Sequence, residues 1–165
     1  MKNPSGKPSA GERSAISLKI GDAAACNKAI SAAIAKRANE LAQPWPCHPR
    51  SDQENWHLAE KEVLKPLCCG ILDSKDEAIV SIFCSALGTK DLTEIEVCVE
   101  PHRVTLVGRG GSDGKPAENT TTYRALPFVD EIDPSSTITT LKHGTTLEIR
   151  LRKVSKQELM PSRAA

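Results

Sequence analysis

Apolar and polar residues alternate most regularly in the middle of the chain, across residues 92–100. Three apolar side chains occupy every second position, between glutamates and a cysteine: Ile95, Val97 and Val99 alternate with Glu94, Glu96, Cys98 and Glu100. A strand with one buried face and one solvated face has this period of two. Pro101 interrupts the run, which resumes at Val104 and ends at Gly108. The pattern predicts two strands joined by a short turn.

Shorter apolar runs lie on both sides of this predicted hairpin. We expect strands at residues 67–72, 78–86, 123–126, 137–141 and 147–151, with a glycine-rich loop over residues 108–122. Short strands at intervals of about 8–12 residues are typical of an all-β sandwich. The predicted fold class is therefore mainly β: an immunoglobulin-like antiparallel β-sandwich over residues 66–154.

Helical spacing replaces the alternation in residues 29–65. Ile30, Ile34, Ala38 and Leu41 recur at intervals of three or four, and Pro44 ends this predicted helix. A second helix begins with a Ser51…Glu54 capping box, carries an apolar stripe of Trp56, Ala59 and Val63, and stops before Pro66. The pattern predicts an N-terminal two-helix hairpin that packs through Ile34, Leu41, Trp56 and Val63 and rests on the sandwich.

Both ends of the chain lack a sustained period. Residues 1–28 are rich in Ser, Gly, Pro, Lys and Ala, which predicts a disordered tail, either a solvated leader or a weak client-contacting arm. Residues 155–165 are expected to form a flexible C-terminal tail. No apolar stretch approaches the roughly 20 residues of a membrane span, and we find no secretory signal, so we expect a cytoplasmic protein.

Composition removes several function classes. The 165 residues carry a formal net charge of +1, so no strong field favours nucleic acid or a membrane surface, and neither is expected as a partner. Aromatic residues make up 3% of the chain, which predicts an aliphatic core. The histidines share no motif, and Asp130, Glu131 and Asp133 fit a solvated turn. The glycines of residues 108–114 lack the lysine and helix of a phosphate-binding loop. We therefore expect no catalytic residues and no enzyme.

Six cysteines allow a redox or a metal interpretation. A reducing compartment favours structural thiols over disulfides. A zinc site would use Cys47, His48, Cys68 and Cys69, but these residues lack the Cys-x-x-Cys spacing of zinc knuckles, and adjacent cysteines on a strand point to opposite faces. We expect no metal and no cofactor, and a switch at Cys68 and Cys69 is disfavoured for the same reason.

The helical segment carries an Arg-Ala-x-x-Leu sequence at residues 37–41 and a Trp-x-x-Ala-Glu sequence at residues 56–60. This pair resembles a short bacterial domain of unknown function. The resemblance implies a helical hairpin and brings no chemistry.

A second resemblance rests on several short motifs in a fixed order. They are Leu-Gly-Thr-Lys-Asp-Leu at residues 87–92, Val-Thr-Leu-Val-Gly at 104–108, Ile-Asp-Pro at 132–134 after Arg124, and Leu-Lys-His-Gly at 141–144. Together they resemble the alpha-crystallin domain of small heat-shock proteins over residues 66–153. The chain lacks the family's C-terminal Ile-x-Ile/Val, which relatives dock into a neighbour's groove, and residues 108–122 lack a recognisable exchange strand.

The resemblance implies an ATP-independent holdase whose partners are partly unfolded or aggregation-prone proteins, with self-association into a dimer or small oligomer. A groove for clients or partners would be lined by Ile95, Val97, Val99, Leu141 and Leu147; the alternative is that these side chains fill the core. A second functional hypothesis is a non-chaperone protein–protein interaction adaptor built on the same sandwich, with the helical hairpin as a docking element.

Overall fold

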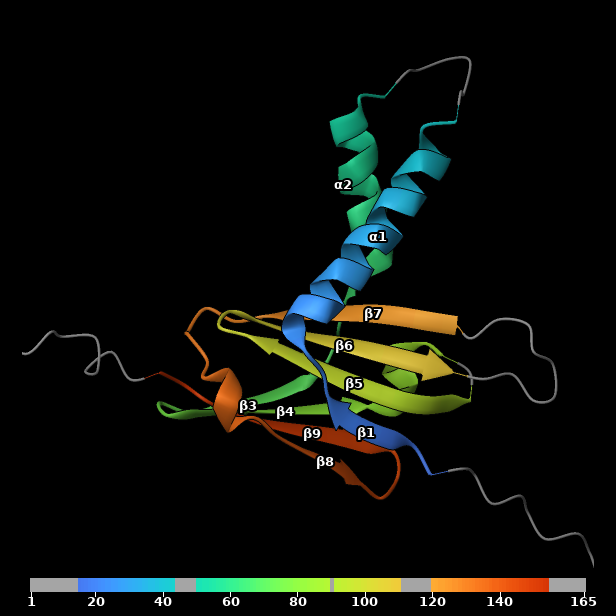
Figure 1. Ribbon diagram of the computed structural model, residues 1–165. Coiled ribbons are helices and arrows are strands. Elements are labelled where there is room, and N and C mark those ends of the chain that lie inside the picture. Colours follow the sequence, from blue (N-terminus) through green and yellow to red (C-terminus); the bar gives the residue numbers. More distant parts are fainter. Residues whose placement is uncertain (1–14, 44–49, 90, 111–119, 155–165) are drawn as a thin grey trace, which may run out of the picture.

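The computed structural model describes residues 15–43, 50–89, 91–110 and 120–154, which form two β-sheets and a pair of helices (Figure 1). Sheet A has the strand order β1-β5-β6-β7-β2, and sheet B has the order β3-β4-β9-β8. Sheet A contains β1 (Ser17–Ile20), β2 (Leu64–Pro66), β5 (Leu92–Glu100), β6 (Arg103–Gly110) and β7 (Thr120–Pro127). Sheet B contains β3 (Gly70–Asp73), β4 (Glu77–Phe83), β8 (Ile138–Lys142) and β9 (Thr146–Arg152).

The two sheets enclose an aliphatic core. Its fully buried members come from strands of both sheets: Val80 and Ile82 from β4, Ile95 and Val97 from β5, Val104 and Leu106 from β6, and Leu147, Ile149 and Leu151 from β9. Each set lies at every second position of its strand, because successive side chains of a strand point to opposite faces. The predicted mainly β sandwich with a helical hairpin is confirmed.

The helical hairpin stands on the outer face of sheet A (Figure 1). It consists of α1 (Ala23–Leu41) and α2 (Asp52–Val63). Ser51 accepts a hydrogen bond from the Glu54 amide at 3.2 Å, and Glu54 accepts one from the Ser51 amide at 2.8 Å, so the predicted capping box is present. Neither of these helices is long and apolar enough to cross a membrane.

The hairpin and sheet A share a second apolar cluster. α1 contributes Cys26, Ile30, Ile34 and Ala38, α2 contributes Ala59, and the outer face of the sheet contributes Cys98 and Val107. By its alternation with Ile95, Val97 and Val99, Cys98 belongs to the face of β5 that carries the glutamates, which the pattern predicts to be solvated. The structure corrects this, because α1 covers that part of β5 and leaves Cys98 only 2% exposed.

The prediction of a disordered N-terminal tail through residue 28 was wrong for residues 15–28, which contain β1 and the first turns of α1. The helix begins at Ala23 instead of residue 29 because Asp22 caps it, accepting a hydrogen bond from the Ala24 amide at 3.1 Å. Residues 1–14 and the whole of the predicted C-terminal tail, 155–165, lie outside the described residues. The proposed division of the chain into four domains stays a prediction.

The expected packing role of Trp56 was also wrong. Ile34 is buried, and Leu41 and Val63 pack against the hairpin cluster as predicted, but Trp56 is 40% exposed. Ala59, fully buried, and Asn55 form the buried side of α2 instead. Adjacent helical residues are separated by about 100°, so a stripe that includes Asn55 turns Trp56 towards solvent.

The sequence pattern predicted a wholly antiparallel sandwich, and the structure differs from this at two places. β1 pairs in parallel with β5, and β2 pairs in parallel with β7, at the two edges of sheet A. Both segments were missed as strands: β1 lay in the expected tail, and β2 follows α2 directly where only a helix end was expected. The other described pairings are antiparallel.

We expect Ala59→Leu to lower the free energy of unfolding by about 1–3 kcal/mol, because the larger side chain separates α2 from α1 where no space exists. Urea denaturation followed by circular dichroism measures this. Ala32→Leu, at an exposed position of α1, is the matched control and should stay within about 0.5 kcal/mol of the wild type. Equal effects at both positions would contradict the packing described for Ala59.

Candidate binding edge of the sandwich

The candidate site is the edge of β5, where β1 lies in parallel register. Leu18 is paired with Ile95 and Ile20 with Val97. β1 also contacts β8 of the other sheet, so it lies where the two sheets meet (Figure 1). Ile16 and Leu18 are half-buried and pack against the sandwich core. An extended segment therefore already occupies the opening at this side of the sandwich.

The five side chains predicted to line a groove lie at or beneath this edge. Ile95, Val97 and Leu147 are fully buried, Val99 is 7% exposed, and Leu141 of β8 is half-buried against the same core. They do not form an open groove in this structure, which corrects that expectation: four of them fill the core, and β1 packs on the same cluster. A role for them in binding partners stays a prediction.

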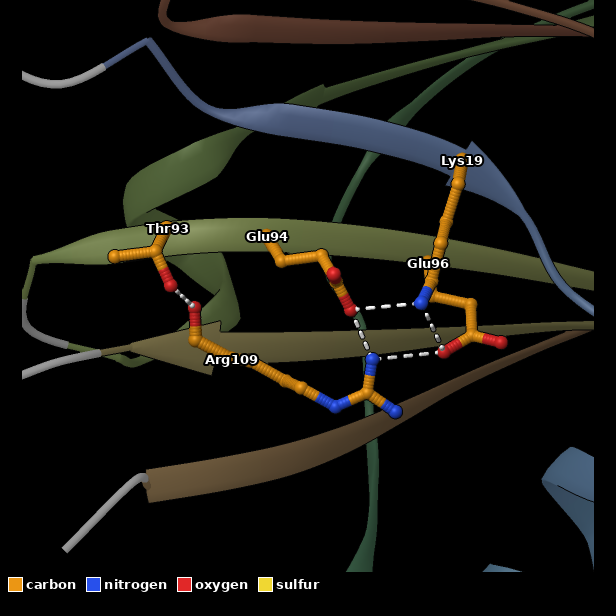
Figure 2. A network of polar contacts seen from close by, with 5 residues as sticks. All are labelled: Lys19, Thr93, Glu94, Glu96 and Arg109. Carbon is orange, nitrogen blue, oxygen red and sulfur yellow. Dashed lines mark hydrogen bonds and ion pairs between the residues drawn. The ribbon is translucent and has the colours of Figure 1, made fainter.

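Charged side chains tie β1 to the neighbouring strands on the outer face of sheet A. Figure 2 shows Lys19 of β1 reaching Glu94 and Glu96 of β5, with its Nζ 3.1 Å from Glu94 Oε1 and 3.7 Å from Glu96 Oε2. Arg109 of β6 contacts both carboxylates as well, with its Nη1 2.9 Å from Glu96 Oε2. Two cations and two carboxylates thus connect three adjacent strands.

This network changes the acidity of Glu94. A hydrogen bond from Lys19 has the largest effect on the pKa of Glu94 and lowers it. Burial, the next largest effect, raises this pKa, and Arg109 lowers it further. The Lys19 side chain is 46% exposed and the Glu94 side chain 28% exposed, so water screens the pair. Ion pairs of this kind contribute about 0–1 kcal/mol each to stability. They therefore orient β1 without fixing it permanently.

Gly21 directly follows β1 and begins the turn into α1. Its amide donates a hydrogen bond to the Val97 carbonyl at 2.9 Å. A Cβ atom at this position would lie 2.2 Å from Glu96 Oε1, so only glycine fits without displacing the Glu96 side chain. The close approach places the start of α1 directly beside β5.

The remaining candidate chemistry is dispersed. Among the described residues, no three or more His, Cys, Asp or Glu side chains are grouped to hold a metal ion. Cys47 and His48 lie outside the described residues, Cys68 is exposed and Cys69 is half-buried. In the acidic corner, Asp133 accepts a hydrogen bond from the Ser135 amide at 2.9 Å, and Asp130 pairs with Lys153 at 2.9 Å. These contacts stabilise a turn.

β1 is the part of the site that sequence reasoning missed. Its signal is a short alternation, in which Ile16, Leu18 and Ile20 are separated by Ser17 and Lys19. That pattern has the strand period of two, but it lies next to residues without any period.

No family model matches the chain, and no curated protein matches it. Solved structures do show similarity. Heat shock protein 16.0 from Schizosaccharomyces pombe is 17% identical, with 61% of this chain and 97% of that chain covered and a TM-score of 0.41. A small heat-shock protein from Xylella fastidiosa is 15% identical, with 60% and 94% covered and a TM-score of 0.43. The rat alpha-crystallin domain is 16% identical, with 58% and 98% covered and a TM-score of 0.38.

We expect Lys19→Met to raise the pKa of Glu94 towards its ordinary value, because the largest stabilising partner of the carboxylate is removed. Carboxyl-detected NMR titration measures the change, and Lys28→Met, at an exposed position of α1, is the control.

The same contact predicts a pH dependence of β1 attachment. The pKa of Glu94 in the folded protein lies below the ordinary value of 4.5. Its stabilising effect is therefore complete above pH 4.5 and is lost as the pH falls through the lower, folded-state value. Identical titration curves for Glu94 in the wild type and in Lys19→Met would contradict the assignment.

Proposed function

We propose that this protein is a small heat-shock-protein-like, ATP-independent chaperone, a holdase that binds partly unfolded or aggregation-prone proteins. The observation that carries the proposal is β1, an extended segment that pairs with the β5 edge; its Leu18, and Ile16 directly before the strand, pack on the core. A client segment with the same alternation finds the same backbone groups and apolar surface when β1 leaves. The alpha-crystallin-like motifs over residues 66–153 support the same function.

The outer face of sheet B adds apolar surface. Leu72, Phe83 and Ile138 are 69%, 68% and 59% exposed. Leu72 lies opposite Ile79 on β4, and Ile138 lies opposite Arg150 on β9, so apolar side chains and a cation share one row across the sheet. Such a surface suits weak contacts with many non-native chains better than a single close-fitting partner.

Self-association into a dimer or small oligomer is part of the proposal. β3 and β8 form the edges of sheet B, and all four residues of β3 are exposed. An exposed edge strand offers backbone hydrogen-bonding groups to a second chain. Light scattering coupled to size-exclusion chromatography measures the resulting mass.

A second candidate function, a protein–protein interaction adaptor, is favoured by the exposure of Trp56. This side chain is 40% exposed on α2, in a hairpin that projects from the sandwich (Figure 1). Exposed tryptophans often anchor specific interfaces. A monomer with no effect on aggregating proteins would favour the adaptor, and Trp56→Ala should then abolish binding of a defined partner while leaving the fold unchanged.

The test of the holdase is light scattering of several unrelated heat-aggregating proteins without nucleotide. We expect the wild type to suppress aggregation near stoichiometric ratios. Leu18→Asp should be the more active protein, suppressing aggregation at a several-fold lower ratio of this protein to client. The reason is that loss of this half-buried leucine weakens β1 attachment by about 1 kcal/mol or more.

Val129→Asp is the matched control, since it also replaces an apolar side chain by aspartate, at a position that is 98% exposed. It should behave as the wild type does. Absence of suppression by the wild type for all clients would overturn the holdase. Suppression that is equal in the wild type and Leu18→Asp, with both folded by circular dichroism, would place client binding away from the β5 edge.

A further inference from the structure

Two cysteines meet where the helical hairpin rests on the sandwich. Cys26 lies early in α1, and Cys98 lies on the outer face of β5. They are 6% and 2% exposed and belong to one apolar cluster. The two thiols are close enough to interact, since each changes the pKa of the other.

Independent contacts on both sides hold the two cysteines together. Before the pair, the Gly21 amide donates to the Val97 carbonyl at 2.9 Å. After it, Asn27 Nδ2 donates to Glu100 Oε1 at 2.9 Å. Arg103 also donates to Asn27 Oδ1 at 3.1 Å and to Glu100 Oε2 at 2.9 Å. The start of α1 is therefore fixed over β5 at the residues that flank Cys26 and Cys98.

We propose that Cys26 and Cys98 are a thiol pair that small-molecule disulfides oxidise to an intramolecular disulfide, joining the hairpin covalently to the sandwich. In the first step, the Cys26 thiolate attacks one sulfur of the oxidant, whose S–S bond breaks and releases one thiol. In the second step, Cys98 loses its proton and attacks the Cys26 sulfur, releasing the second thiol. The pair loses two electrons and two protons, and the oxidant gains them.

Exposure assigns the two roles, since Cys26 is 6% exposed and Cys98 is 2% exposed, and the pKa directions agree with this order. Donation from the Cys98 thiol lowers the pKa of Cys26, which favours the attacking thiolate. The same hydrogen bond, together with burial, raises the pKa of Cys98, so this thiol keeps its proton until the second step. Cys84, which is also buried, differs: burial raises its pKa, and it lies in the sandwich core instead of the hairpin cluster.

The bond has a consequence for the β5 edge, which rests on the function proposed above. Only Gly21 and Asp22 separate β1 from α1. A disulfide at Cys26 restrains the start of α1 and thereby shortens the distance that β1 can move away from β5. Oxidation is therefore expected to keep the edge covered, and reduction to permit its opening.

The experiment incubates the reduced full-length protein with oxidised glutathione, blocks the remaining thiols with N-ethylmaleimide, and maps the peptides by mass spectrometry under non-reducing conditions. We expect a cross-linked peptide containing Cys26 and Cys98 to accumulate in the wild type and, at the same rate, in Cys84→Ser. It should be absent from Cys26→Ser, in which Cys98 remains a thiol.

Two results would overturn the proposal. One is glutathione retained on Cys26 beside a free Cys98 thiol in the folded protein. The other is an unreacted pair after the exposed Cys68 has been fully modified. The wild-type peptide map decides between these outcomes even where a variant fails to fold.

The consequence for the edge has its own measurements. In the oxidised wild type, hydrogen exchange at residues 17–20 should slow, and aggregation suppression should fall several-fold, with neither change in Cys26→Ser. If a completed cross-link leaves aggregation suppression unchanged, the disulfide does not control access to the β5 edge, although the disulfide itself is confirmed. No suppression in either redox state, with the cross-link formed, would instead reject the holdase.

Discussion

The constraint on which the rest of this structure depends is that the central strands of sheet A carry apolar side chains on both faces where α1 crosses them. β5 and β6 place Ile95, Val97 and Leu106 in the sandwich core, and they also place Cys98 and Val107 on the outer face. A second layer must cover that outer face, and the helical hairpin does so. Because the chain enters the hairpin through β1 and leaves it through β2, the covering layer is tied to opposite edges of the same sheet.

This connection determines how the sheet edges are protected. β1 and β2 pair with β5 and β7, so the long antiparallel strands of sheet A are not left open. The two covering strands are short, and they carry Lys19 and Pro66, a charge and a residue without an amide proton, which discourage further pairing. The β5 edge is therefore covered by four residues held by screened ion pairs. That balance makes it a better candidate for regulated binding than a permanently buried core strand.

The sequence predicted those parts of the fold that depend on local chemistry. Alternation of Ile95, Val97 and Val99 located β5, and the Ser51…Glu54 pair located the start of α2. It did not predict contacts that join distant segments. Nothing beside Cys98 indicates that α1 will cover it, and the four residues of β1 gain their conformation from β5. The apolar character of Trp56 favoured it as a packing residue, whereas the small side chain of Ala59 permits the close approach of the helices.

The same contacts determine what a partner must overcome at the β5 edge. Displacing β1 removes its parallel pairing and the contacts of Lys19, but it also pulls on Gly21, whose amide is bound to the Val97 carbonyl. The next residue, Asp22, caps α1, so movement of β1 beyond Gly21 removes the cap and exposes the first turn of the helix. Burial of Cys26 and Ile30 resists that second step. In the reduced protein, opening is thus easier as far as Gly21 than beyond it, which limits an incoming segment to the length of β5 that β1 now occupies.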